Sequence, residues 1–452
     1  MTITDATPDQ LEVPRTPADV IAMARRIGSV AAPHAARHDR EGSFVTEGYE
    51  AIRANGFGII AVPRELGGGG HDLETVCRAL AVLARYCTNT ALAISMHQHN
   101  VLSLAWRWRL GDRAVERTLR RIAFGDVILS SSGSADPANP GVTAIPVEGG
   151  LLVTGRKRFC SGVPGADLVL TMARVEEGGQ QWTTTVLIPT SDPGTEIIPD
   201  WDALGMRGSG SNPVSFTDVF VPDANVLEFE PLWSLPGHFR PGRVRGARRA
   251  ALADDEADED EGSEDEADDE YEGDDDENED DESDDDEAEG EAAPERLDGH
   301  RLPALQIALA VIAAVYLGAA GGVRDRAMHM AAGRGADDPI RQRLAGLLTQ
   351  EFRSAWWALD ALIADTNDDS LGTEGHFITT MLAKRQVILS SIRIVELAME
   401  LLGSQTYMRA LPFEQALRDV RAGITHPLAP EKTLLEVGQS ALNFFANQQS
   451  SR

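Results

Sequence analysis

The chain has 452 residues and contains little cysteine and little lysine. Its three cysteines, Cys77, Cys87 and Cys160, are too few for a disulfide framework, which favours a reducing, cytoplasmic compartment. Lysine also occurs only three times, beside many arginines, and we interpret this as genomic GC bias rather than function. The first residues, MTITDATPDQ, include acidic side chains and no apolar core, so we expect no secretory signal.

Several kinds of chemistry need patterns that the sequence lacks. No group of His or Cys has the spacing of metal ligands, so no metal site is predicted. There is no Gly-x-Ser-x-Gly elbow of a serine hydrolase. The glycine run 67–70 is not followed by the βαβ pattern of a phosphate-binding loop. These absences argue against a metal site, a serine-hydrolase mechanism and a phosphate-binding loop.

The net charge of −31 comes from one segment. Residues 254–295 hold 29 of the 72 acidic residues and no basic one, which leaves 43 acidic residues against 41 Lys and Arg. A nearly neutral remainder has no basic footprint for nucleic acid, and none is expected as a partner. Residues 237–300, basic and then acidic, are predicted to be disordered. This segment is either a tolerated loop insertion or a tether for a basic partner.

One uncharged stretch, residues 302–323, is long enough to cross a bilayer. It is rich in Ala and Gly, and the helices expected after it are long and apolar enough to cover it. We therefore predict a helix buried in a bundle and no membrane association.

Hydrophobic periodicity divides the chain into helices, strands and helices again. Residues 16–125 are predicted to be helical, with Thr16 as an N-cap followed by Pro17 and Asp19. Short β-rich runs separated by turn residues follow, at 126–133, 151–159, 167–175, 181–189 and 213–222. Helices are predicted again at 303–333, 338–366, 376–403, 412–422 and 431–446. The expected fold is α+β and multidomain: a helical domain (1–125), a small β-barrel or sandwich (126–236), the disordered insertion (237–300) and a four-helix bundle (301–452).

Four motifs together resemble those of the acyl-CoA dehydrogenase superfamily. They are WDALGMRGSGSNPVSFTDVFVP (201–222), VPRELGGGG (62–70), VTGRKRFCSG (153–162) and AMELLGSQTYMRALPFEQALRDVRA (398–422). The first has a Gly/Ser loop around Arg207 that could cradle an anion. The similarity covers most of residues 17–447 apart from the acidic insertion.

The resemblance implies FAD, with FMN less expected, between the β-domain and the C-terminal bundle. It also implies a homodimer or homotetramer, because a second subunit contributes to the flavin site in this family. Carried over residue by residue, it assigns the cofactor to Ser132, Ser134, Phe159, Cys160, Ser161, Arg334 and Gly403. Ser161 would hydrogen-bond the flavin N5 edge, and Arg334 would reach the pyrophosphate of a neighbouring subunit's FAD.

The family's usual catalytic base is missing. The resemblance places Pro427 where many members carry a Glu, and the start of the first C-terminal helix has no acid either. Two replacements are candidates: Glu431, which a helix start also explains, and His426. In the flavin-monooxygenase branch of this fold no such base is needed, and a histidine of SMHQH could serve the activated oxygen. His97 and His99 lie two apart, so at most one can face the cleft, and His97 is our candidate.

These observations leave three hypotheses. The first is α,β-desaturation of an acyl thioester by proton abstraction and hydride transfer to flavin N5. The second is a flavin monooxygenase on the same fold, in which reduced flavin and O2 react and a His or Ser handles the activated oxygen. The third is a non-catalytic scaffold whose acidic segment recruits a basic partner.

Overall fold

A computed structural model describes residues 13–125, 127–132, 141–177, 180–231, 301–333, 337–426 and 429–450. The segment 237–300 lies outside these described residues, and so do Ser134, Arg334 and Pro427. The predictions that concern them, including the disorder of the insertion, therefore stay predictions.

The N-terminal part is helical. Its helices are α1 (Pro17–Glu41), α2 (Thr46–Asn55), α3 (Leu73–Ala84), α4 (Thr88–Arg109) and α5 (Glu116–Gly125). The start of α1 is the predicted one: the Thr16 side chain accepts from the Asp19 backbone, and the Asp19 side chain accepts from the Thr16 backbone. The helix ends at Gly42, which takes the left-handed conformation (φ 66°).

The central part is one eight-stranded sheet. Its strands are β1 (Leu129–Ser131), β2 (Val142–Val147), β3 (Gly150–Cys160), β4 (Leu168–Glu177), β5 (Gln180–Pro189), β6 (Thr195–Ile197), β7 (Asn212–Pro222) and β8 (Val226–Pro231). The order is β6-β7-β3-β2-β4-β5-β8, and β1 pairs with β4 in parallel. The five predicted runs correspond to β1, β3, β4, β5 and β7, whereas β2, β6 and β8 were not predicted.

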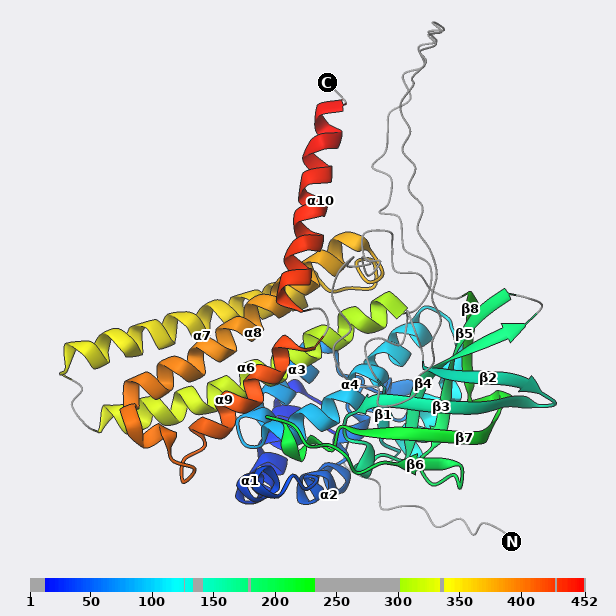
Figure 1. Cartoon of the computed structure of the whole chain (residues 1–452), viewed down its shortest axis with the longest axis horizontal. Helices are drawn as coiled ribbons and strands as arrows, with labels where there is room; N and C mark the ends of the chain where they lie inside the picture. Colours follow the sequence, from blue (N-terminus) through cyan, green and yellow to red (C-terminus); the bar gives the residue numbers. More distant parts are fainter. Residues whose placement is uncertain are drawn as a thin grey trace, which may run out of the picture. The chain divides into compact units, whose positions relative to one another are not determined.

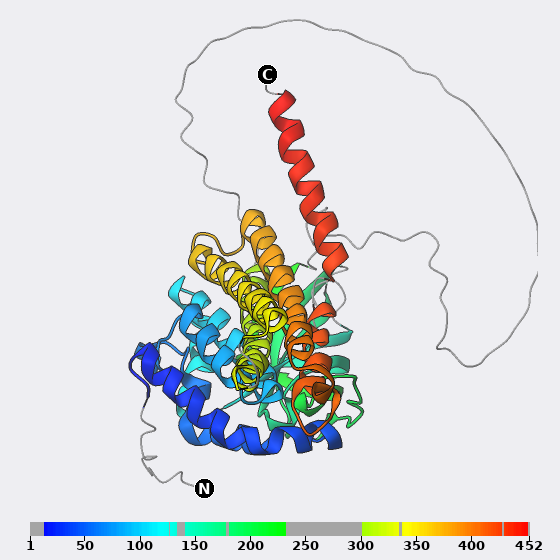
Figure 2. The ribbon, with the colours of Figure 1, turned by 90° about the vertical axis from the view of Figure 1, so that its left-hand side faces the viewer.

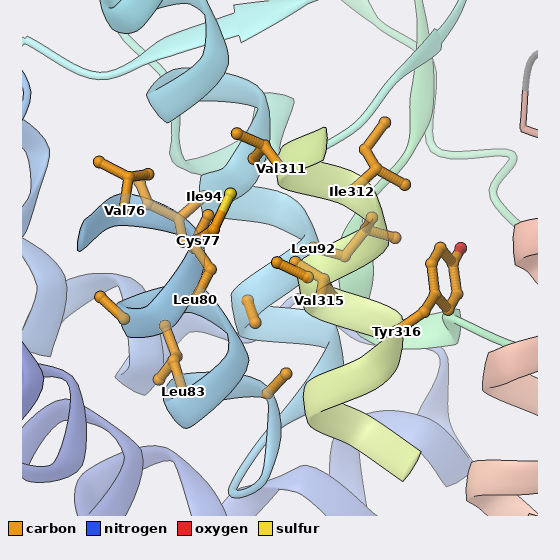
Figure 3. Packing of buried hydrophobic residues seen from close by; sticks show 14 of the residues in the cluster. Val76, Cys77, Leu80, Leu83, Leu92, Ile94, Val311, Ile312, Val315 and Tyr316 are labelled. Carbon is orange, nitrogen blue, oxygen red and sulfur yellow. The ribbon is translucent and has the colours of Figure 1, made fainter. Parts of the chain in front are cut away.

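The C-terminal part is helical again. Its helices are α6 (Arg301–Ala332), α7 (Pro339–Asp365), α8 (Glu374–Leu402), α9 (Phe413–Arg421) and α10 (Pro430–Ser450). Helix α6 passes the length and composition test for a membrane span, but 83% of its apolar window is buried in the structure. Figure 3 shows why: Val311, Ile312 and Val315 of α6 pack beside apolar side chains of α3 and α4. The prediction of a buried bundle helix is confirmed.

The fold class is also confirmed, with helices before and after a central sheet (Figure 1). Helices α3 and α4 pack against α6, so the first helical part and the last share one hydrophobic core. A second hydrophobic core is formed by side chains of the sheet. In two views α10 projects from the other helices (Figures 1 and 2). The place where α4, the sheet and α6 come together is the position of the candidate site.

Candidate active site

A cavity of about 260 Å³ lies between α4, the sheet and α6. Its lining comes from segments far apart in the sequence: Met96, His99, Asn100, Ser103, Leu104 and Arg107 of α4; Ser131, Ser132, Phe159, Ser161, Leu170, Thr171, Met172, Thr185, Leu227 and Glu228 of the sheet; Ala304, Leu305, Ala308, Leu309 and Ile312 of α6; and His426. Four of the predicted site residues meet here: Ser132, Phe159, Ser161 and His426.

The two helical walls differ in polarity. The α4 residues recur at helical spacing from 96 to 107, and most carry polar side chains. The α6 residues recur in the same way from 304 to 312, and all are apolar. A ligand in this cavity therefore has an apolar face against α6 and polar groups along α4.

The structure places His99, and not His97, at the cavity. His97 is fully buried, with Nε2 2.7 Å from the Gly58 carbonyl and Nδ1 accepting from the Leu129 backbone at 2.9 Å. Both ring nitrogens are therefore engaged in holding α4 to its neighbours. The prediction of His97 as a catalytic residue is corrected, because its side chain leaves the helix in another direction from the cavity.

His99 has a free ring nitrogen. Its Nδ1 lies 3.2 Å from the Ser95 carbonyl, which can only accept, so Nδ1 carries the proton and Nε2 is an acceptor. Burial lowers the pKa of His99 to about 4. The imidazole is therefore neutral at pH 7, with a base available to whatever occupies the cavity.

Asn100, beside His99, carries a buried donor that nothing in the described structure satisfies. The residue is 6% exposed, and its Nδ2 has no hydrogen-bond partner. A buried amide N–H without a partner is destabilising by about 1–3 kcal/mol. Asn100 lines the cavity, but this nitrogen itself has almost no accessible surface there.

The sheet contributes a series of hydroxyl groups. Ser161 Oγ and Ser211 Oγ are 2.7 Å apart, and Ser211 Oγ is 2.7 Å from Ser209 Oγ. Ser132 Oγ lies 2.6 Å from Thr171 Oγ1. The inner hydroxyls fix the rotamer of Ser161, which can then donate to or accept from a ligand. Sequence reasoning missed Ser209 and Ser211, although GSGS stands in the motif of residues 201–222.

His426 closes the cavity from the C-terminal side. Its Nδ1 lies 3.3 Å from the hydroxyl of Tyr316 on α6, and the two rings meet edge to face at 5.6 Å. The His426 carbonyl accepts from Lys384 Nζ at 2.8 Å, and the Gly423 carbonyl accepts from the same amine at 3.0 Å. Burial, with a smaller effect of the Lys384 charge, lowers the pKa of His426 to about 4. This histidine is therefore also neutral at pH 7.

An ion pair forms the other end of the cavity. Arg107 Nη1 donates to Glu228 Oε2 at 2.7 Å, Nε donates to Asp112 Oδ2 at 2.8 Å, and Nη2 donates to the Leu227 carbonyl at 3.1 Å. The Thr185 hydroxyl donates to the second oxygen of Glu228. The side chains of Arg107 and Glu228 are only 7% and 9% exposed. Glu228 is the one carboxylate among the described lining residues.

Three further predicted site residues do not line the cavity. Cys160 is buried in the sheet core, because successive side chains of a strand alternate and Phe159 and Ser161 take the cavity side. Glu431 is exposed in the first turn of α10, as expected of an acid favoured by the helix dipole. Gly403 is an exposed residue that ends α8 (φ 73°, ψ −155°). Cys160 and Glu431 are thus corrected as side chains of this site, and Gly403 supplies a turn that glycine alone adopts readily.

Arg207 does not offer a free guanidinium to an anion. Its Nη1 donates to Asp202 at 2.7 Å and to the Ala203 carbonyl at 3.0 Å, while Nε donates to the Asp39 carbonyl at 2.8 Å. The Gly/Ser loop is therefore held by its arginine, and the interpretation of its backbone N–H groups as an anion cradle stays a prediction.

The cavity suits a flavin ring. Phe159, 57% exposed, contacts Trp201 edge to face at 5.5 Å and presents an aromatic surface beside the Ser161 and Ser132 hydroxyls. The opposite wall, on α6, is apolar. A flat aromatic ring system with a polar edge fits such surroundings.

Comparison with known proteins supports the resemblance to acyl-CoA dehydrogenases. Residues 19–123 match the N-terminal domain of acyl-CoA dehydrogenases, and residues 130–219 match their middle domain. L-Evernosamine nitrososynthase of a Micromonospora strain is 28% identical over 433 residues, which cover 91% of this chain and 87% of that one. Dibenzothiophene monooxygenase of Mycolicibacterium goodii is 31% identical over 217 residues, 46% of this chain and 51% of that enzyme.

A solved structure extends the likeness to the whole fold. The structure of KijD3 in complex with FMN and a dTDP-linked amino sugar covers 97% of this chain and 97% of its own, with 26% identity and a TM-score of 0.70. Two family domains match the chain, the likeness extends along nearly its whole length, and the helix–sheet–helix order frames the cavity. The protein therefore belongs to the acyl-CoA dehydrogenase superfamily.

Proposed function

We propose that the protein is a flavin-dependent monooxygenase that transfers an oxygen atom to a small, largely apolar molecule. The observation that carries the proposal is the chemistry of the cavity wall. Among the described lining residues it brings together two neutral histidines and a fixed serine hydroxyl, and the one carboxylate is tied to Arg107. Two of the relatives, a nitrososynthase and a monooxygenase, support the same assignment.

The expectation of acyl thioester desaturation is replaced by this alternative. Desaturation needs a carboxylate within hydrogen-bond reach of the substrate α-carbon proton. Glu228 is held by Arg107 and Thr185, and Glu431 is exposed on α10. Nothing else among the described lining residues could act as a carboxylate base.

Reduced flavin, when bound, supplies two electrons to O2, so that one oxygen atom enters the substrate and the other leaves as water. The chain's own groups would manage the protons and the position of oxygen. His99 Nε2 would accept a proton or a hydrogen bond, and the Ser161 hydroxyl would hold the edge of the flavin ring. The apolar α6 wall excludes water from the reacting atoms.

We further propose FMN as the flavin, in place of the FAD that the resemblance implied, because FMN is bound in the KijD3 complex. By the family resemblance, Ser134 would lie in the loop that faces the flavin, and Arg334 would reach the phosphate of a flavin held by a neighbouring subunit, in a homo-oligomer of the cytoplasm.

Two assays together test the function. In the first, the protein loaded with oxidised flavin is mixed anaerobically with a series of acyl-CoAs. In the second, the protein with reduced FMN and O2 is given dibenzothiophene, isobutylamine and indole. We expect no bleaching of the flavin by any thioester, and oxygenated product, detected by mass spectrometry with ¹⁸O2, in the second assay. Rapid bleaching by a thioester without O2 would reject the monooxygenase. A chain that binds no flavin would support the scaffold hypothesis.

A further inference from the structure

The end of the cavity at Glu228 carries a charge that the described chain does not balance. Arg107 is the cation of a cluster whose carboxylates are Asp112 and Glu228, so the cluster has one negative charge in excess. We propose that this end is a subsite for an amine or ammonium group of the substrate. Oxygenation of a bound amine rests on the proposed function, whereas the binding of the amine does not.

Burial makes the excess charge matter. The side chains of Arg107 and Glu228 are 7% and 9% exposed and that of Asp112 is 22% exposed, so the excess charge lies in a mostly buried cluster, where it is unfavourable. Each carboxylate oxygen of Glu228 accepts one hydrogen bond from the chain, from Arg107 or from Thr185, and can accept another. A ligand N–H donor, above all a cationic one, would use this free capacity.

The same contacts disfavour an anionic ligand. The guanidinium of Arg107 already donates to Asp112, to Glu228 and to the Leu227 carbonyl. The other titratable groups of the cavity, His99 and His426, are uncharged at pH 7 because burial lowers the pKa of each to about 4. No lining side chain in the described part of the chain is left as a free cation for a carboxylate or a phosphate.

Position along α4 separates this subsite from the reacting end. His99 and Arg107 are eight residues apart on one helix, which corresponds to about 12 Å. About one turn before His99 on α4, the Met96 sulfur accepts from the hydroxyl of Ser131, which pairs with Ser161, the residue assigned to the flavin. A substrate would therefore bind with its amine at Glu228, its apolar body against α6 and its oxidisable atom near His99 and Asn100.

Isothermal titration calorimetry with three probes of matched shape tests the subsite. Phenylpropylamine, phenylpropanol and phenylpropionate are titrated into the full chain without reduced flavin or O2. We expect the amine to bind about tenfold more tightly than the alcohol, and the carboxylate to bind most weakly. Because the measurement needs no turnover, it stands or falls separately from the monooxygenase reaction.

Variants assign any preference to Glu228. Glu228→Gln should weaken amine binding about tenfold and alcohol binding less than about twofold, while Glu228→Asp, which keeps the charge, should retain the preference. Glu196→Gln, at an exposed position of β6, is the matched control and should behave as the parent chain. Equal loss for amine and alcohol in Glu228→Gln would leave only a structural role and overturn the proposal. So would a parent chain that binds the carboxylate or the alcohol as tightly as the amine, which decides the matter even if Glu228→Gln does not fold.

Discussion

At the scale of single residues, two histidines two positions apart have different tasks. His97 joins α4 to the Gly58 carbonyl and the Leu129 backbone, whereas His99 leaves Nε2 open to the cavity. Burial lowers the pKa of both to about 4, so titration does not distinguish them. The direction of the side chain does.

We therefore predict that His99→Ala lowers turnover and His97→Ala lowers stability. Loss of a positioned acid–base group typically slows a reaction about a hundredfold or more, and His99→Ala should do so with little change in melting temperature. His97→Ala removes two buried hydrogen bonds and leaves a void, which should reduce the free energy of unfolding by about 2–4 kcal/mol. Both are measured with the fastest substrate of the oxygenation assay and by calorimetry. If His97→Ala reduced turnover more than His99→Ala at equal folded fraction, the assignment would be reversed.

At the scale of elements, the sequence predicted much of the fold but less of the site. Four of the five C-terminal helices were located within two residues, as in 303–333 for Arg301–Ala332. The fifth, predicted at 431–446, continues to Ser450. Strands β2, β6 and β8 were missed because they are short, and β2 also contains Pro146.

The sequence predicts which residues share a face of a helix or strand, but it does not predict which neighbouring element that face contacts. Spacing indicated that His97 and His99 could not share the cavity, yet choosing between them requires the rotation of α4 against α6. Strand alternation alone would have separated Cys160 from Phe159 and Ser161. Tyr316, Lys384 and Glu228 come to the site through packing and had no sequence signal beyond being polar residues in apolar surroundings.

The turn Ala422–Ile424 and the residues after it depend on helix α8. Lys384, 2% exposed, donates to the carbonyls of Gly423 and His426 and so holds the segment that presents His426. Burial lowers the pKa of Lys384 to about 8, which leaves it largely charged at pH 7. Lys384 is a positioning residue, since it acts on the cavity through His426.

We expect Lys384→Met to reduce turnover about tenfold or more and to raise the pKa of His426 toward its ordinary value, because the neighbouring charge is lost. The measurement is the chemical shift of the His426 ring in NMR titrations, together with the acid limb of the rate. Lys384→Arg, which keeps the charge and donors, should restore part of both. An unchanged His426 titration in Lys384→Met would show that the lysine supports only the stability of the bundle.

At the scale of the whole molecule, α9 fastens the helical parts to the sheet loop. Arg418 donates to both carboxylate oxygens of Asp39 on α1, at 2.9 and 2.6 Å, and to the Leu204 carbonyl. The next residue, Asp419, accepts from the Met206 backbone at 2.5 Å. Burial raises the pKa of Asp419 to about 7, although this backbone hydrogen bond opposes the shift.

The raised pKa predicts a pH-dependent stability. The folded chain holds the Asp419 proton where the unfolded chain has lost it, so the contribution is complete below about pH 4 and is lost as pH rises through 7. Asp419→Asn keeps an oxygen acceptor and does not titrate. Between pH 5 and pH 7 the variant should gain about 2 kcal/mol relative to the parent chain, measured as the difference of two urea unfolding series. A constant difference across that range would show that Asp419 titrates normally in the folded state.

Helix α10 bears on how copies of the chain assemble. Leu434, Leu435, Leu442 and Phe445 are 41–74% exposed, and helical spacing puts them in one stripe about 100° wide. A contiguous apolar stripe on a projecting helix is typical of an interface. The homo-oligomer expected from a shared flavin site supplies the partner surface, a second copy of the chain.

We predict that removal of residues 430–452, or the single change Leu435→Glu, lowers the oligomeric state seen by analytical ultracentrifugation. Gln439→Glu adds the same charge outside the stripe and should leave assembly unchanged. Because the cavity of one chain is lined without α10, a monomeric truncation should still bind phenylpropylamine, whereas a truncated chain that stays fully assembled would exclude this helix as the interface.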